Sequence, residues 1–144
     1  LKTNPMKLPI LFLIILFFSS CKPKEELATN DQALKRVWML TSFKDFEKAK
    51  LMKYQAFIDL TTVEKGTAKM GCNAIFFTYK VKEGNKINFS NVGSTEMYCN
   101  EKMEVENAFV KEIVSYKTYE VKGHKLILTN DKNEQIECIA QDWD

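Results

Sequence analysis

The sequence predicts a small α+β domain that is mainly antiparallel β, a closed or barrel-like sheet of about eight strands with one helix. Two observations predict it. Short runs in which apolar and polar residues alternate recur from Val37 onward, separated by turns rich in Gly, Asn and Asp,. One segment, Glu101 to Ser115, instead spaces its apolar residues three and four positions apart, as an amphipathic helix does,. Closely spaced short strands are typical of antiparallel barrels and closed sheets.

The first half of the domain contains four alternating runs. They are expected at residues 37–43, 56–60, 67–72 and 75–81, with Trp38 and Leu40 on one face of the first. The inward positions change phase between the third and fourth runs, so we expect a β-bulge at Asn73 or Ala74. The lysine-rich segment Asp45 to Lys53 is expected to be a solvated loop rather than a contact for an anionic surface.

The second half begins with a strand that holds Ile87 and Phe89. The helix over Glu101 to Ser115 follows, with Asn100 as its N-cap and acidic residues in its first turn,. Three further strands are expected at residues 116–122, at residues 125–129 and in a last run through Ala140.

The N-terminus has the organisation of a secretory signal. Lys2 and Lys7 precede an unbroken apolar run from Ile10 to Phe18, and small residues follow it,. At about 1.5 Å per residue this run reaches roughly 14 Å, which is too short for a hydrocarbon core of about 30 Å. Residues 1–20 are therefore expected to be a cleaved signal peptide.

Phe18-Ser19-Ser20-Cys21 resembles a lipobox, in which the cysteine is acylated with fatty acids such as palmitate before cleavage. Cys21 is therefore the expected lipid attachment site. An ordinary signal peptide and an uncleaved anchor are the alternatives. Residues 21–34 are expected to be a tether with a short turn of helix around Asp31 to Leu34, because charged residues with Pro do not build a core. Residues 35–144 form the expected domain.

The expected location is the cell envelope, with the lipid in the outer membrane and the domain either periplasmic or surface-exposed. Lys24-Glu25-Glu26 resembles a short export signal that sends some Bacteroidetes lipoproteins to the cell surface. Lys2 and Lys7 account for the formal charge of +2, so the remaining chain has equal numbers of basic and acidic residues. The absence of a net basic excess argues against a nucleic-acid partner.

Little in the sequence indicates catalysis or a bound metal. Cys72, Cys99, Cys138 and His124 are too widely spaced to form a zinc-ligand motif, and nothing pairs a cysteine with His124 as a nucleophile and base,. His124 is expected to be exposed at a hairpin turn. Nucleophile elbows, phosphate-cradling glycine loops and His-Glu-x-x-His motifs do not occur,. We expect no enzyme activity, no cofactor and no metal.

Three segments in this order resemble the META/HslJ domain family. They are Gly71-Cys72-Asn73 after a strand, Thr95-Glu96-Met97-Tyr98-Cys99 before a helix, and Gly123 to Leu128 before a final strand. The helix segment Val105-Glu106-Asn107-Ala108-Phe109, Trp38 in the first strand and Asp142-Trp143 near the end also fit. Lys35-Arg36 departs from the small residues that the family often has, so the register of the first strand is in doubt. The likeness covers roughly residues 35 to 144.

The resemblance implies a small barrel-like α+β domain, an envelope location and a link to stress response, but no catalytic residues. Cys72 and Cys99 are then the candidate structural disulfide, which would close a loop of about 27 residues; two neighbouring thiols are the alternative. Cys138 alternates with apolar residues in a strand and is the expected spare thiol. The expected function is partner binding or stress tolerance by a membrane-anchored module.

A small-ligand carrier is the alternative function, because closed antiparallel barrels can enclose a cavity. The state of the barrel interior separates the two functions. A carrier is excluded if the inward side chains fill it, among them Trp38, Met70, Phe77, Tyr79 and Phe109. Outward aromatic residues, with Phe57 and Phe76, are a candidate partner patch.

Overall fold

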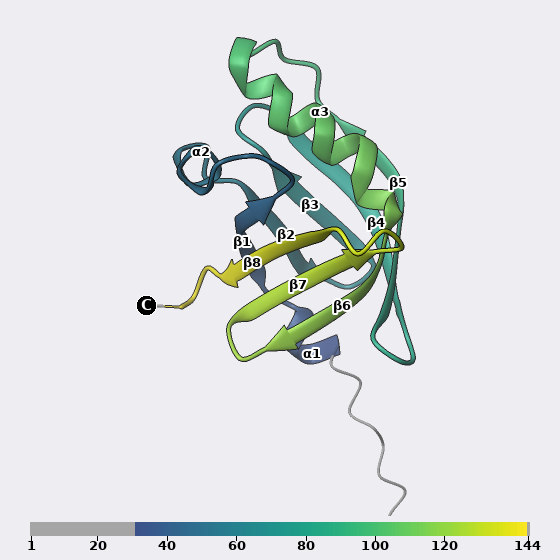
Figure 1. The fold of residues 1–144 in the computed structure, drawn as a ribbon. Helices are drawn as coiled ribbons and strands as arrows, with labels where there is room; N and C mark the ends of the chain where they lie inside the picture. The colour runs from purple at the N-terminus through teal and green to yellow at the C-terminus, as the bar shows by residue number, and fades with distance from the viewer. Residues whose placement is uncertain (1–30, 144) are drawn as a thin grey trace, which may run out of the picture.

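The computed structural model describes residues 31–143, in which eight antiparallel strands close into a barrel in chain order (Figure 1). The strands are β1 (Val37–Phe43), β2 (Phe57–Thr62), β3 (Lys65–Lys69), β4 (Ala74–Lys82), β5 (Lys86–Ser94), β6 (Tyr116–Lys122), β7 (Lys125–Asn130) and β8 (Gln135–Ala140). The helices are α1 (Asp31–Leu34), α2 (Lys48–Lys53) and α3 (Met103–Glu112), with 3₁₀ turns η1 (Asn100–Lys102) and η2 (Ile113–Ser115) flanking α3. The predicted fold class is confirmed.

Each strand pairs with the next, and β8 returns to β1, with Trp38 opposite Ala140. The paired stretch between β5 and β6 is the shortest in the barrel, with one residue pair, Lys86 and Thr118. The connection through α3 and η2 lies between these strands in the sequence. Closure removes the exposed strand edges that an open sheet would leave.

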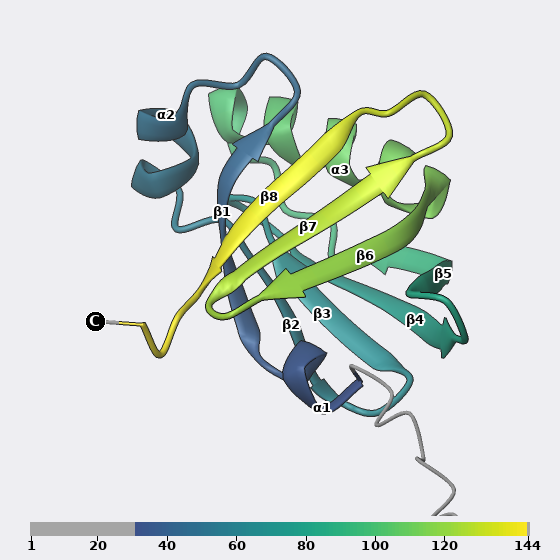
Figure 2. The ribbon, with the colours of Figure 1, turned by 60° about the horizontal axis from the view of Figure 1, so that its bottom comes forward.

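The barrel has two different ends (Figures 1 and 2). At one end lie α1 and the β2–β3, β4–β5 and β6–β7 turns; at the other lie α2, α3 and the β3–β4 turn. At the α1 end, the indole Nε1 of Trp38 donates a 2.8 Å hydrogen bond to the carbonyl oxygen of Leu34. Leu34 is itself fully buried. The helical turn expected in the tether is therefore present and packs against the domain.

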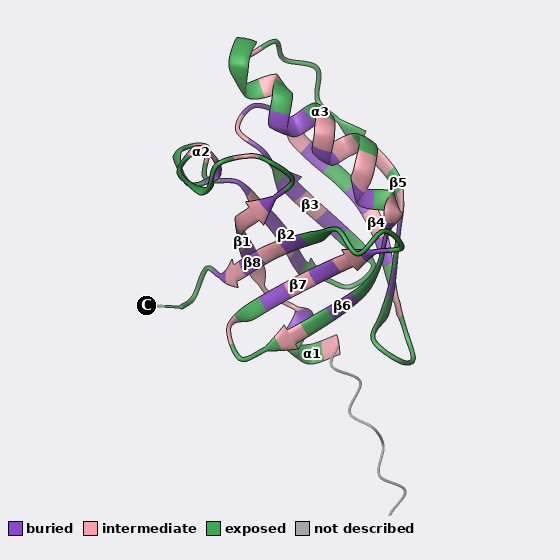
Figure 3. Ribbon diagram, viewed as in Figure 1, coloured by how far each residue is buried: buried purple, intermediate pink, exposed green. Residues whose placement is uncertain are grey.

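Buried residues recur along the strands and on α3 (Figure 3), and their side chains form the core of the barrel. The five inward residues that separate a filled barrel from a carrier are between 0% and 3% exposed: Trp38, Met70, Phe77, Tyr79 and Phe109. A side chain with so small an exposed fraction has almost no surface that a water molecule can reach. Small eight-stranded barrels are filled in this way, and these five residues leave no room for a ligand among them.

The expected bulge at Asn73 or Ala74 is wrong. β3 ends at Lys69 and β4 begins at Ala74, and these two residues face each other across a hairpin. The change of phase arises because the chain reverses direction, so that Ala68 and Ile75 become inward partners. Gly71 makes the reversal with a φ of +122°, a conformation that favours glycine,.

Two local expectations around the helices are also wrong. The expected loop Asp45 to Lys53 contains α2, which buries Leu51 against the barrel. One buried residue among lysines is too weak a periodic signal to predict a helix. Asn100 does not cap α3 with its side chain; it lies in η1, and its Oδ1 accepts a hydrogen bond from the hydroxyl of Tyr98.

Candidate functional site

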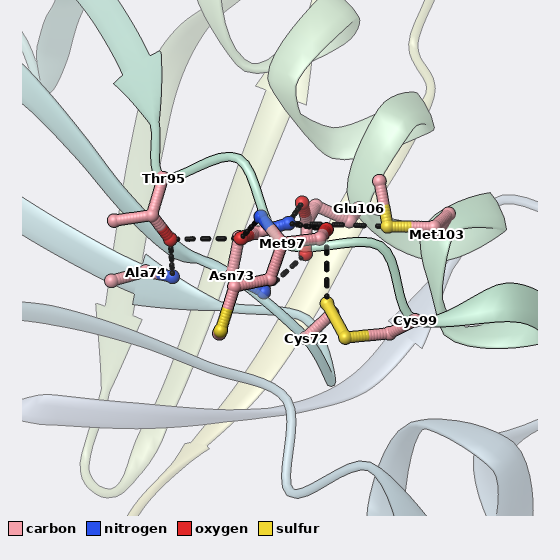
Figure 4. Close-up of a disulfide and its surroundings, with 8 residues drawn as sticks. All are labelled: Cys72, Asn73, Ala74, Thr95, Met97, Cys99, Met103 and Glu106. Atoms are coloured by element: carbon pink, nitrogen blue, oxygen red, sulfur yellow. Dashed lines mark hydrogen bonds between the residues drawn. A yellow bond between two sulfur atoms is a disulfide. The ribbon is translucent and has the colours of Figure 1, made fainter.

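The α3 end of the barrel contains the β3–β4 turn, residues 70–73, which is held in place by a disulfide and by hydrogen bonds. We call it the locked turn. Cys72 in the β3–β4 turn and Cys99 before η1 form a disulfide, with 5.9 Å between their Cα atoms (Figure 4). The bond joins two segments separated by 27 residues, as the candidate disulfide required. Cys138, the expected spare thiol, is free and fully buried in β8.

Asn73 lies next to the disulfide and makes hydrogen bonds through both ends of its side-chain amide and through its backbone N–H. Its Nδ2 donates to Oε1 of Glu106 at 2.7 Å and to the carbonyl oxygen of Met97 at 2.9 Å. Its Oδ1 accepts from the backbone N–H of Met97 at 2.7 Å and from the hydroxyl of Thr95 at 2.8 Å. Its backbone N–H donates to the other oxygen of Glu106 at 2.7 Å. The side chain of Asn73 therefore holds Thr95, Met97 and α3 together.

Glu106 is 2% exposed and is the buried acid of this network. Both of its carboxylate oxygens accept hydrogen bonds from Asn73, and burial of a carboxylate is tolerable only with such partners,. Glu106 was not predicted from the sequence to be a site residue. Its position next to Val105 and three residues before Phe109, both fully buried, is the signal that would have found it,.

The segment held by this network exposes two large side chains to solvent. Met97 is 57% exposed and Tyr98 is 84% exposed. Their backbone is fixed by Asn73 on one side and by the disulfide on the other. The polar groups of Asn73 and Glu106 are used inside the fold, so the chemistry available to an outside molecule lies in Met97, Tyr98 and their surroundings.

Two recesses adjoin the locked turn and share Lys53, Tyr54 and Lys102. The larger, of about 450 Å³, also borders Gly71 of the turn and carries Lys69, so it has three lysines and no carboxylate in its lining. The smaller, of about 260 Å³, borders Cys99 and adds Asn100 and Glu101. We call Met97, Tyr98, Lys53, Lys69 and Lys102 the locked-turn surface.

The aromatic residues divide between the core and the surface. Phe77 and Tyr79, which were expected inside, are buried, as are Tyr116 and Tyr119. Phe76 is 50% exposed on the outer face of β4, and Phe57 is half-buried on β2. Tyr98 is the most exposed aromatic residue within residues 31–143, and it lies in the segment that is bonded to the locked turn.

A further recess, of about 570 Å³, lies along β8 and is lined in part by His124, Ile139 and Trp143. The rings of His124 and Trp143 stack with their centroids 3.8 Å apart. Nη1 of Arg36 lies 3.4 Å from the ring nitrogen Nδ1 of His124. His124 was expected to be exposed, but Trp143 covers it and leaves it half-buried.

Within residues 31–143, no three His, Cys, Asp or Glu side chains are grouped so that they could hold a metal ion. The same part of the chain has no helix with the length and apolar character needed to cross a membrane. Cys21, the expected lipid attachment site, lies outside the described residues.

The fold and the locked turn define a small antiparallel β-barrel module with one main helix across one end. The META domain model matches residues 31–143, so this chain belongs to the META domain family. The matched range begins at α1 and includes every element of the barrel. A search of curated proteins found no match.

Solved structures share the fold at low sequence identity. A protein from Burkholderia xenovorans, determined by NMR, is 19% identical with a TM-score of 0.65, covering 79% of this chain and 88% of its own. A second NMR structure is 13% identical with a TM-score of 0.57, covering 78% and 95%. The crystal structure of a DUF4847 family protein from Bacteroides vulgatus is 12% identical with a TM-score of 0.53, covering 76% and 95%.

Proposed function

We propose that this chain is a non-enzymatic envelope lipoprotein, anchored through Cys21, whose locked-turn surface binds a protein partner. The partner offers a segment with apolar and acidic side chains. Binding of this kind is the module's contribution to stress tolerance in the envelope. The observation that carries the proposal is the exposure of Met97 and Tyr98 on a backbone that is fixed from both sides.

Fixed backbone matters because ordering a flexible loop on binding consumes part of the interaction energy. The disulfide and the bonds from Asn73 have already ordered this segment. Tyr is also well suited to binding, since it combines a large apolar ring with a polar hydroxyl and has few rotatable bonds. Tyr98 and Met97 therefore resemble the anchor residues found at the centre of protein interfaces.

Lysines in the two recesses that border the locked turn indicate the charge of the partner. Lys53, Lys69 and Lys102 line the adjacent recesses, and none of the three forms an ion pair within residues 31–143. Such groups attract acidic side chains and speed their association more than they add affinity. The alternative function as a carrier is disfavoured by the filled interior.

The partner is tested by purification of the acylated protein, with its associated proteins, from detergent-solubilised membranes. Replacement of Met97→Ser and Tyr98→Ser together is expected to reduce recovery of the partner about tenfold or more, as loss of interface anchors does. A matched control replaces Val63→Ser and Phe76→Ser, which are 60% and 50% exposed elsewhere on the barrel. Equal recovery with both double variants would contradict the proposed surface.

The anchor is tested independently by the mass of the mature N-terminus, which should begin with an acylated Cys21. Cys21→Ala is expected to move the protein out of the membrane fraction. Digestion of whole cells by a protease distinguishes a surface-exposed domain, which is degraded, from a periplasmic domain, which is protected.

A further inference from the structure

The outer face of β3, β4 and β5 has an unusual distribution of charge. These three strands contain five lysines and no carboxylate. Four of the lysines lie toward the α1 end: Lys65, Lys80, Lys82 and Lys86. None of the four forms an ion pair within the part of the chain that the structure describes.

The strand register gathers the four ammonium groups on one surface. Lys65 faces Thr78, two residues before Lys80 on the same side of β4. Lys82 and Lys86 are direct cross-strand partners in the β4–β5 hairpin. Like charges directly opposite each other destabilise a sheet, so this pair costs the folded protein stability that an external anion would restore.

Acidic groups near this surface compensate only part of the charge. Glu64 and Glu83 lie in the two adjoining turns and leave an excess of two positive charges, four lysines against two carboxylates. Asp59 faces outward on β2, where its Oδ1 accepts hydrogen bonds from Thr61. On β6, Glu120 is paired with Lys122 at 2.8 Å.

The chain enters the domain at the same end of the barrel as these four lysines. Asp31 begins α1, which lies at the end that holds the β2–β3 and β4–β5 turns (Figure 2), and its carboxylate is paired with Lys35. Nine residues lie between Cys21 and Asp31, and a fully extended chain across these ten Cα-to-Cα steps spans at most about 35 Å. A lipid on Cys21 therefore keeps the α1 end within that distance of the bilayer surface.

We propose that Lys65, Lys80, Lys82 and Lys86 dock the α1 end of the barrel onto the anionic lipid surface that holds the anchor. This inference rests on the proposed anchor at Cys21. The tether makes docking intramolecular, so that individually weak attractions between lysines and anionic headgroups act at a high effective concentration. Docking turns the opposite end of the barrel, with the locked-turn surface, away from the membrane (Figure 1).

The test uses the acylated full-length protein reconstituted into vesicles of phosphatidylcholine, with or without phosphatidylglycerol. Rates of acetylation by a membrane-impermeant amine reagent are measured for each lysine by mass spectrometry. On anionic vesicles the four docking lysines are expected to react about threefold or more slowly than on neutral vesicles, and about 0.5 M NaCl should abolish the difference because it screens the charges. Lys48, Lys53, Lys111 and Lys132, which lie elsewhere, should react equally on both.

Variants make the test specific. Lys80→Gln, Lys82→Gln and Lys86→Gln together should remove the protection of Lys65, whereas the matched set Lys48→Gln, Lys111→Gln and Lys132→Gln should leave it intact. Equal protection of all lysines, protection of the second set only, or no protection would each overturn the docking surface. Two further measurements report on the anchor separately: flotation of the protein with the vesicles, and the mass of the N-terminal peptide, which shows whether Cys21 is acylated. An acylated protein that floats without selective protection overturns docking alone, and a chain that is not acylated overturns the anchor.

Discussion

Asn73 and Glu106 form a two-point contact: the side-chain and backbone N–H groups of Asn73 each donate a 2.7 Å hydrogen bond to a different oxygen of the Glu106 carboxylate. The contact connects the β3–β4 turn to α3, and both residues are almost completely buried. The Gly-Cys-Asn and Thr-x-Met-x-Cys segments that identify the family therefore serve first to build a rigid end of the barrel. In the proposed function, the same segments also hold Met97 and Tyr98 in place for a partner.

The first prediction concerns this contact. Glu106→Gln should lower the free energy of unfolding by about 1–3 kcal/mol, because the amide presents a donor to one of the two N–H groups of Asn73. Asn73→Ala should cost about 3 kcal/mol, since it also frees Thr95 and Met97. Urea unfolding under oxidising conditions measures both. Glu104→Gln, at the exposed ion pair with Lys50, is the control and should change stability by less than about 1 kcal/mol,.

The second prediction concerns the disulfide. Intact-mass measurement should show an increase of about 2 Da on reduction, and loss of the bond should lower the free energy of unfolding by about 3 kcal/mol. Cys138→Ala should leave the mass increase unchanged. Burial raises the pKa of the Cys138 thiol, which disfavours the reactive thiolate, so alkylation at alkaline pH should require unfolding,. Modification of Cys138 in the folded protein would contradict its buried position.

The third prediction compares two buried tyrosines. The hydroxyl of Tyr79 donates to the carbonyl oxygen of Leu60 at 2.9 Å, whereas the hydroxyl of Tyr116 has no hydrogen-bond partner among residues 31–143. Tyr79→Phe should therefore destabilise the protein by about 1–2 kcal/mol. Tyr116→Phe should be neutral or stabilising, because it removes a buried polar atom without a partner. Equal losses in the two variants would contradict these assignments.

The two buried tyrosines, Tyr79 and Tyr116, also predict how the stability of the protein depends on pH. Burial raises the pKa of both Tyr79 and Tyr116 to about 12 from the ordinary value of 10.0. Above pH 10 the unfolded chain loses these protons while the folded chain keeps them, so stability should fall as the pH rises from about 10 to 12. The fall should be smaller in each Phe variant. Thermal unfolding at several alkaline pH values measures it.

The fourth prediction concerns two glycines in strands. A Cβ atom on Gly66 would lie 2.0 Å from Cε2 of Phe77, its cross-strand partner, and the ring packs edge-on against Phe89. Gly66→Ala should therefore destabilise the barrel by about 1–3 kcal/mol through overpacking. A Cβ on Gly93 meets nothing within 4 Å, so Gly93→Ala should stay within about 0.5 kcal/mol of the parent,. Similar unfolding midpoints for the two variants would contradict the packing at Gly66.

The sequence by itself determined the features that depend on local periodicity and composition. Alternation identified the strands and placed Trp38, Leu40 and Cys138 inside, because side chains on a strand point alternately to its two faces,. Spacing of three and four residues identified α3 for the corresponding reason. The order of the cysteine-containing segments indicated the family and the disulfide.

Only the tertiary structure decided features that depend on residues far apart in the chain. The reversal at Gly71 and the helix α2 depend on packing against other strands, and neither leaves a long periodic pattern. Glu106 looked like one of several acids on α3, and it is buried because Asn73, 33 residues away, supplies two donors. The exposure of Tyr98 follows from the same long-range contacts, which fix its backbone while leaving its ring in solvent.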